Sequence, residues 1–473
     1  MTAAFDYDLV CIGSGPAGQR AAVQAAKVGK RVAVIEKRRS VGGVCIEIGT
    51  IPSKTFREAV RSFSDRVHDQ QGPPRNRPSM EQLVNRVAHV VNLEVHVVQD
   101  QLSRNDVDLI HGQATFVDAH TLSVASDAGR RTLTARYILI AVGTRASEPA
   151  NATPDGRTLI LSDQILELDK LPRTMVVVGG GIIGIEYASM FAALGIQVTV
   201  VDKRPRPLEF VDQEIVDELI YQLRRNNVTL RCGEAVEKIE ISAGPPRRGV
   251  IQLESGKHLV ADVVLFSVGR IGATDGLDLA AVGLEVDERG RLKVDEMFRT
   301  RLPHIFAAGD VIGYPALAAT SSEQGRLAAR HMFGLDAEPM AAHFPIGVYA
   351  IPEISMVGAT EEELTRARVP YETGIARFRE IARGQILGDD SGMFKMIFHR
   401  DDKRLLGAHC IGTGATELIH IGQAVLGLGG GLDYFLRTVF NYPTLAECYK
   451  VAALHAANKL HHAAAARLDA GPT

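Results

Sequence analysis

Short apolar segments alternate along this chain with longer, helix-length segments. The first apolar segment, residues 9–12, leads through a glycine-rich turn into a helix-length segment at 19–28 and a second apolar segment at 31–35. This order predicts a strand, a turn, a helix and a second strand. Residues 174–204 repeat the same order. We therefore expect an α/β fold with two Rossmann-like units.

The first turn carries glycines in the pattern GxGxxG. Gly13 permits the turn, Gly15 lets the backbone approach a pyrophosphate, and Gly18 lets the helix pack closely on the strand. Glu36 ends the second strand, 23 residues after Gly13, where a carboxylate accepts hydrogen bonds from a ribose. Glycines, strands, helix and acid together predict a dinucleotide site.

The second unit repeats this motif with Gly179, Gly181 and Gly184, and Asp202 follows its first glycine at the same interval of 23 residues. Two complete units predict two dinucleotide sites. A protein with two such sites usually brings a bound cofactor next to a diffusible one, and FAD with a nicotinamide dinucleotide is the natural pair.

Three later apolar segments also end in glycine, at 137–146, 263–270 and 304–311. The third ends in Gly309 and Asp310, and an acid at the end of a strand can bind the sugar-alcohol chain of a flavin. The alternative is that Asp310 is a turn residue.

Length, charge and cysteine usage exclude several classes of protein. The chain has 473 residues and a net charge of −3, which predicts several domains and argues against nucleic acid as a partner. The polar start, residues 1–8, leaves no room for a signal peptide, and no apolar run is long enough for a bilayer. Five scattered cysteines do not form a disulfide framework, so we expect a cytoplasmic protein.

Further motifs extend the pattern to most of the chain: "GGVC" to "IPSK" at 42–54, "SVGR" at 267–270, "FAAGD" at 306–310 and "YPTLAE" at 442–447. In this order they resemble the pyridine nucleotide-disulfide oxidoreductase family. The resemblance implies an FAD domain from residues 1–148 and 271–345, an NAD(P) domain at 149–270, and a C-terminal α+β dimerisation domain at 346–473. It implies a homodimer, and leaves open whether a larger assembly forms.

The resemblance also implies which residues bind each dinucleotide. For FAD these are Gly13, Gly15, Pro16, Ala17, Gly18, Glu36, Lys37, Gly43, Cys45, Lys54, Ala114, Gly143, Asp310 and Ala318. For NAD(P) they are Gly179, Gly181, Ile182, Gly184, Glu186, Asp202, Lys203, Arg204, Gly269 and Arg270. No metal site is expected.

Two departures from the family affect its dithiol chemistry. The family's CxxxxC pair is reduced to Cys45, because Thr50 stands in the second position, and a hydroxyl does not form a stable anion near neutral pH. Thr50 can instead cap a helix beginning around Pro52. Tyr442 replaces the family's histidine base, while the glutamate that orients that base remains as Glu447. We therefore expect no dithiol chemistry.

The residues that the family uses for hydride transfer are present. Lys54 and Glu186 match a pair beside the flavin, and the alternative is a surface ion pair. With Thr50, Tyr442 and Glu447 they make up the predicted catalytic positions. The resemblance implies Si-specific, ping-pong hydride transfer from NADPH to NAD⁺ through FAD. A quinone reductase or diaphorase, or a redox sensor with Cys45 as its thiol, is the alternative.

The predicted coenzyme selectivity is mixed. Asp202 suits the 2′-hydroxyl of NAD, whereas Lys203, Arg204 and Arg206 suit the 2′-phosphate of NADP. A site shared by both coenzymes requires such a set. The alternative is a solvated, charged loop.

Overall fold

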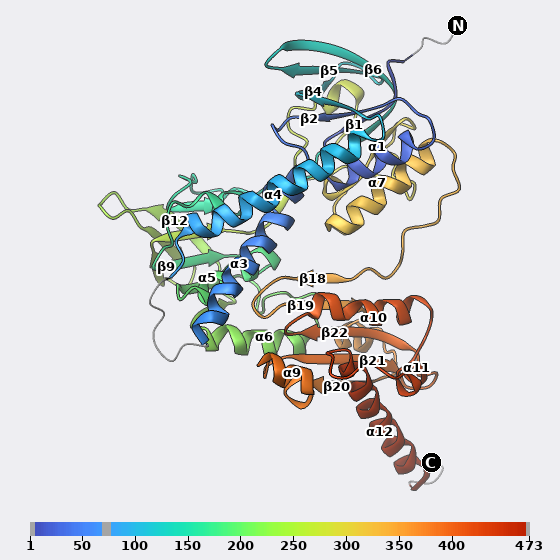
Figure 1. The fold of residues 1–473 in the computed structure, drawn as a ribbon. Helices are drawn as coiled ribbons and strands as arrows, with labels where there is room; N and C mark the ends of the chain where they lie inside the picture. Colours follow the sequence, from blue (N-terminus) through green and yellow to red (C-terminus); the bar gives the residue numbers. More distant parts are fainter. Residues whose placement is uncertain (1–4, 69–76, 470–473) are drawn as a thin grey trace.

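The first glycine motif begins a mixed sheet in the computed structural model, which describes residues 5–68 and 77–469 (Figure 1). The sheet contains strands that precede the second unit in the sequence and one strand that follows it, because β17 pairs in parallel with β6. Its elements are β1 (Tyr7–Ile12), α1 (Pro16–Ala26), β2 (Val32–Glu36), α2 (Gly43–Glu47), α3 (Thr50–His68), α4 (Met80–Ser103), β3 (Asp108–His111), β4 (Gln113–Phe116), β5 (Thr121–Ser126), β6 (Gly129–Ile140), β17 (Ile305–Ala307) and α7 (Ala318–Met332).

The strands β3, β2, β1, β6 and β17 are parallel, and β4 and β5 extend the sheet in antiparallel fashion from β6. The helices α1 and α7 pack against each other beside this sheet (Figure 1). The long helix α4 begins with a reciprocal cap between Ser79 and Gln82. The polar connection at 68–78 precedes it, and residues 69–76 of that connection lie outside the described residues.

The second glycine motif begins a five-stranded parallel sheet of order β11-β10-β9-β15-β8. The helix α5 is apolar on all sides and most of its residues are buried, as expected for a helix covered on several faces. The elements are β8 (Leu159–Leu161), β9 (Thr174–Val178), α5 (Ile182–Ala193), β10 (Gln197–Asp202), α6 (Gln213–Arg225), β11 (Val228–Cys232), β12 (Val236–Ile241), β13 (Gly249–Leu253), β14 (His258–Ala261) and β15 (Val263–Phe266). Two short strands, β7 (Thr144–Ala146) and β16 (Arg270–Gly272), pair where the chain enters and leaves this unit.

The C-terminal region is an antiparallel sheet of order β18-β19-β22-β21-β20 with helices beside it. The predicted α/β fold with a C-terminal α+β region is confirmed. The elements are β18 (Ile346–Val348), β19 (Ile354–Gly358), α8 (Glu361–Arg366), β20 (Tyr371–Arg377), α9 (Ala382–Leu387), β21 (Met393–His399), β22 (Leu405–Ile411), α10 (Ala415–Gly427), α11 (Leu432–Arg437) and α12 (Glu447–Asp469).

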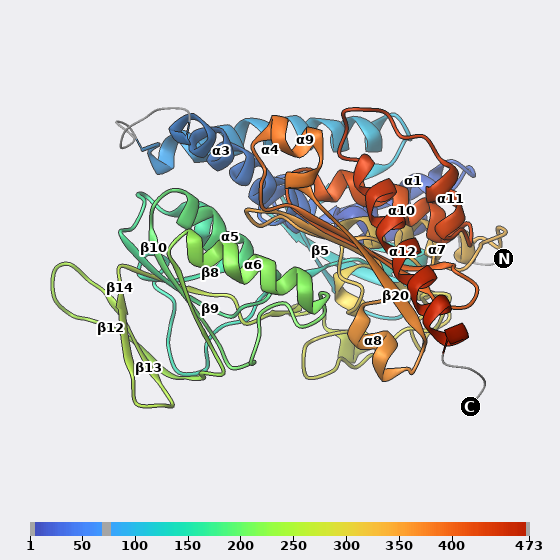
Figure 2. The same cartoon turned by 90° about the horizontal axis from the view of Figure 1, so that it is seen from below.

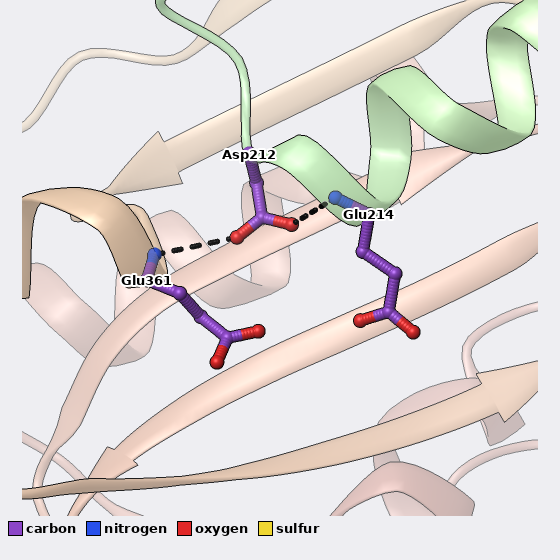
Figure 3. A group of neighbouring side chains, drawn as sticks. All are labelled: Asp212, Glu214 and Glu361. Carbon is purple, nitrogen blue, oxygen red and sulfur yellow. Dashed lines mark hydrogen bonds between the residues drawn. The ribbon is translucent and has the colours of Figure 1, made fainter. Parts of the chain in front are cut away.

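A buried charge cluster joins the second unit to the C-terminal region, where α6 of the second unit contacts β22 (Figure 2). Asp212 caps α6 and accepts hydrogen bonds from the backbone amides of Glu214 and Glu361 (Figure 3). The ammonium group of Lys395 on β21 lies 2.8 Å from Asp212 and 3.0 Å from Glu214, and it also contacts Glu361. These three carboxylates are therefore arranged around a side-chain cation.

No helix among the described residues is both long enough and apolar enough to cross a membrane.

Candidate active site

The first glycine turn forms an open cradle. Gly13 has φ = +107°, and a Cβ there would lie 2.4 Å from the carbonyl oxygen of Ala141. A Cβ on Gly18 would lie 1.9 Å from the carbonyl oxygen of Gly13, so α1 packs directly on the turn. A Cβ on Gly15 would meet nothing within 4 Å, and this residue lines the large cavity described below. The backbone is therefore bare where a pyrophosphate would approach.

This geometry separates two kinds of glycine variant. Gly15→Ala is expected to fold normally but to weaken FAD retention by about 10-fold or more, because the added methyl group enters the cavity. Gly18→Ala is expected to destabilise the fold as well, since its Cβ has no room. Flavin-to-protein absorbance and the melting temperature measure the two effects. Gly244→Ala is the control, because its Cβ meets nothing within 4 Å. Full FAD retention by Gly15→Ala would contradict the proposed cradle.

Glu36 is held at the end of β2 with its carboxylate at the cavity wall. Its Oε2 atom accepts hydrogen bonds from the amide and hydroxyl of Ser14, at 3.0 and 2.5 Å, and its Oε1 atom accepts from the amide of Arg38 at 2.9 Å. The side chain of Arg38 turns away to Glu47. An acceptor position on Oε1 therefore stays available for a ribose hydroxyl.

The cysteine loop forms α2 and the start of α3. Cys45 and Thr50 both line the cavity. Burial raises the pKa of Cys45, and the nearby Thr50 hydroxyl and Lys54 ammonium oppose this only in part. The expectation that Thr50 caps a helix beginning around Pro52 was wrong, because α3 begins at Thr50 itself. Thr50 is thus within the helix, at the wall of the same cavity as Cys45.

Lys54 and Glu186 form a close ion pair at the cavity wall. The Lys54 Nζ atom lies 2.9 and 2.8 Å from the two carboxylate oxygens of Glu186. Their side chains are 25% and 4% exposed, so the alternative of a surface pair is wrong. Tyr349 was missed from the sequence: its amide donates to Glu186 Oε1 at 2.8 Å, and its ring centre lies 4.8 Å from the Lys54 Nζ atom. Three separate regions therefore hold one ammonium group in place.

Asp310 lies just after β17, at the cavity wall. Burial raises its pKa. Its protein hydrogen bonds are long, 3.5 Å from the Thr144 hydroxyl and 3.3 Å from the Ser321 hydroxyl. Such loosely satisfied oxygens can accept hydrogen bonds from a polyol.

The second glycine turn repeats the geometry of the first. Gly179 has φ = +109°, and a Cβ on Gly184 would lie 1.9 Å from the carbonyl oxygen of Gly179. Gly181 and Ile182 line the cavity. At the far edge, Gly269 has φ = +130° with open space around its Cβ position. Arg270 donates to Asp163 at 2.6 Å, a partner that the sequence did not indicate.

The charged segment after β10 is internally paired. Arg204 forms an ion pair with Asp202 at 2.6 Å, whereas Arg206 is paired with Asp217. Asp202, Lys203 and Arg204 line the cavity, but Arg206 is not among its lining residues. The structure therefore does not bring Arg206 to the expected coenzyme site.

One cavity of about 1260 Å³ joins both glycine turns. It reaches the C-terminal region at Tyr349, Thr416 and His420, which no motif indicated. The predicted binding residues at its wall are Gly13, Gly15, Pro16, Ala17, Glu36, Lys37, Gly43, Cys45, Lys54, Ala114, Gly143, Asp310, Ala318, Gly179, Gly181, Ile182, Glu186, Asp202, Lys203, Arg204, Gly269 and Arg270. Gly18 and Gly184 lie behind it, where they support the two turns.

Tyr442 and Glu447 do not line this cavity. Tyr442 is 67% exposed, and Glu447 is the first residue of α12. The Oε2 atom of Glu447 is buried and has no hydrogen-bond partner among the described residues. The catalytic roles expected for these two residues stay predictions.

Comparison with known families decides the classification. Residues 7–325 match the model of the pyridine nucleotide-disulphide oxidoreductases, and residues 344–453 match the dimerisation domain of the same family. The chain belongs to this family. The family confirms the predicted cofactor, FAD, and the predicted substrates, nicotinamide dinucleotides. The chain is therefore an oxidoreductase.

Curated relatives within this family share nearly the full length of the chain. A soluble pyridine nucleotide transhydrogenase of Mycobacterium tuberculosis is 52% identical over 462 residues, covering 96% of this chain and 98% of the relative. One of Pectobacterium atrosepticum is 44% identical over 468 residues, with the same coverage.

Solved structures with the same fold include two neighbours of similar length. LpdA from M. tuberculosis is similar with a TM-score of 0.87 and 25% identity, covering 94% of this chain and 99% of that one. The HOCl-induced flavoprotein disulfide reductase RclA from Escherichia coli has a TM-score of 0.85 and 29% identity, covering 95% and 99%.

Proposed function

We propose that this enzyme catalyses reversible, Si-specific hydride transfer from NADPH to NAD⁺ by a ping-pong mechanism without a redox disulfide. The observation that carries the proposal is the loop at Cys45. Thr50 stands where the family has its second cysteine, and the Lys54–Glu186 ion pair lies at the wall of the same cavity. Relatives at 52% and 44% identity bear the name transhydrogenase.

The first glycine turn, Glu36 and Asp310 would hold FAD, and the second turn would hold one nicotinamide dinucleotide at a time. FAD, when bound, supplies a ring that takes hydride from one nicotinamide and gives it to the next. Lys54 supplies fixed positive charge beside this cavity, where developing negative charge is stabilised without reorganisation. Glu186 and Tyr349 fix the position of that charge. The overall exchange, NADPH + NAD⁺ to NADP⁺ + NADH, needs no further reactant.

The geometry disfavours a sensor built on Cys45. Burial raises the pKa of this thiol, so it is protonated near neutral pH and a poor nucleophile. All five cysteines are free, which is consistent with the cytoplasmic location that we propose with this function.

We also propose that the enzyme is a homodimer formed through the C-terminal region. Residues 344–453 match a dimerisation domain. Large apolar side chains are exposed there, including Leu428 at 88% and Val439 at 93%, and a second copy would cover them. Light scattering is expected to give twice the mass of one chain or a multiple of it.

Steady-state kinetics with NADPH and thio-NAD⁺, both varied, test the mechanism. Double-reciprocal plots are expected to be parallel, because the first product leaves before the second substrate binds. Intersecting lines would contradict the shared site, and faster reduction of a quinone than of thio-NAD⁺ would assign a quinone reductase. Lipoamide and glutathione disulfide are expected to give no turnover. Deuterium at the pro-S position of NADPH is expected to be lost from the NADP⁺ formed, whereas deuterium at the pro-R position is expected to be retained, which tests the Si-specificity.

A further inference from the structure

The carboxylate of Asp202 is saturated by protein donors. Its Oδ1 atom accepts from the amide and the Nε atom of Arg204, at 2.8 and 2.9 Å. Its Oδ2 atom accepts from the amide of Gly180 and from the Nη2 atom of Arg204 at 2.6 Å. A carboxylate oxygen accepts about two hydrogen bonds. A ribose hydroxyl can therefore bind Asp202 only where the guanidinium of Arg204 has left.

The first unit shows that this arrangement is not imposed by the backbone. Glu36 stands in the same place and accepts from the amides of Ser14 and Arg38, as Asp202 does from the equivalent amides. The guanidinium of Arg38 instead lies 2.5 Å from Glu47. In both copies of the motif an arginine follows the acid by two residues. The two copies differ in the partner of that arginine: Arg38 binds Glu47, whereas Arg204 binds the acid itself. In the second unit, Arg204 folds back on the acid.

The guanidinium of Arg204 lies over the glycine turn at the cavity. A Cβ on Gly181 would be 4.0 Å from its Nη2 atom. The side chain is 35% exposed, whereas that of Asp202 is 5% exposed, so the arginine can move while the acid stays fixed. Burial raises the pKa of Asp202, but hydrogen bonds from Arg204 and Gly180 outweigh it and lower the pKa overall. The acid is thus an anion, and it would repel a 2′-phosphate without the guanidinium.

We propose, on the basis of the proposed function, that Arg204 is a coenzyme switch. With NADP(H) the guanidinium stays between Asp202 and the 2′-phosphate and binds both. With NAD(H) it leaves Asp202, whose oxygens then accept hydrogen bonds from the ribose hydroxyls. One acid and one movable cation therefore serve both substrates of a shared site.

Binding of NADP⁺ and NAD⁺ to the oxidised holoenzyme, measured by isothermal titration calorimetry, tests the switch without turnover. Arg204→Gln is expected to raise the Kd of NADP⁺ by about 10- to 100-fold, as for loss of a charged hydrogen bond. The same variant is expected to lower the Kd of NAD⁺ by about 2- to 5-fold, because the ribose no longer displaces a bound guanidinium. Opposite shifts for the two coenzymes are the signature of the switch.

Two further variants serve as controls for the role of Arg204. Arg206→Gln is expected to change neither Kd, because Arg206 pairs with Asp217 away from the cavity wall. Asp202→Asn is expected to weaken NAD⁺ but not NADP⁺. Bound flavin and melting temperature confirm that each variant is folded.

The outcomes separate the switch from the proposed function. If Arg204→Gln weakens both coenzymes equally, or weakens NADP⁺ without tightening NAD⁺, the switch is overturned. A holoenzyme that shows the opposite shifts but no transhydrogenation would sustain the switch and refute the proposed function.

Discussion

Replacing Lys54 with methionine is expected to lower kcat for hydride transfer from NADPH to thio-NAD⁺ by about 10²- to 10³-fold. The variant loses the fixed positive charge at the cavity. It also leaves Glu186, whose side chain is 4% exposed, without its counter-ion 2.8 Å away. Stopped-flow bleaching of the flavin band by NADPH alone measures the first half of the reaction directly.

Controls distinguish lost charge from lost structure. Lys54→Arg keeps the charge and is expected to recover much of the rate, whereas Lys170→Met removes an exposed lysine that is not at the cavity wall and is expected to leave the rate unchanged. A Lys54→Met enzyme with normal flavin content and a kcat within about threefold of the parent would refute the role assigned to this residue.

The second large effect is on stability. Lys395→Met is expected to lower the free energy of unfolding by about 3–5 kcal/mol, the usual cost of breaking a buried ion pair. The side chains of Lys395 and Asp212 are 1% and 0% exposed, and Glu214 and Glu361 share the same ammonium group. Removing it leaves three carboxylates facing one another. Urea denaturation of the holoenzyme, followed by circular dichroism, measures the loss.

The cluster also determines whether the stability of the fold rises or falls with pH. Burial lowers the pKa of His409, which faces Asp212 and Lys395, below its unfolded value of about 6.5. The unfolded state therefore binds a proton first, and stability is lost as pH falls below about 6.5. The pKa of Asp212 is also lowered: burial opposes the shift, but His409 and Lys395 outweigh it. Its contribution is lost as pH falls below about 3.9.

The Lys395→Met defect is expected to be largest near neutral pH and to shrink on acidification, because protonation relieves the carboxylate repulsion. Lys238→Met removes an exposed lysine paired with Glu240 and is expected to cause no measurable change. A Lys395→Met protein as stable as its parent at neutral pH would show that the cluster does not hold the two regions together.

Much of the candidate site follows from local spacing. GxGxxG determines how a strand turns into a helix within six residues. The first glycine of each motif, Gly13 and Gly179, has the positive φ that the predicted turn requires, and the third, Gly18 and Gly184, has no room for a Cβ. Glu36 and Asp202 follow because a helix and a strand of normal length return the chain to the same edge of the sheet. The Lys54–Glu186 pair depended instead on the family resemblance, since 132 residues separate its members.

The sequence by itself determined the two dinucleotide units, the acids at their strand ends, and the replacement of the second thiol by Thr50. Only the tertiary structure decided that Tyr349 holds the Lys54–Glu186 pair, that Asp163 pairs with Arg270, and which basic residues after β10 reach the cavity. The physical reason is the sequence separation over which each kind of interaction acts. Backbone turns are encoded by neighbouring residues, whereas the partner of a side chain depends on segments that fold against it from distant parts of the chain.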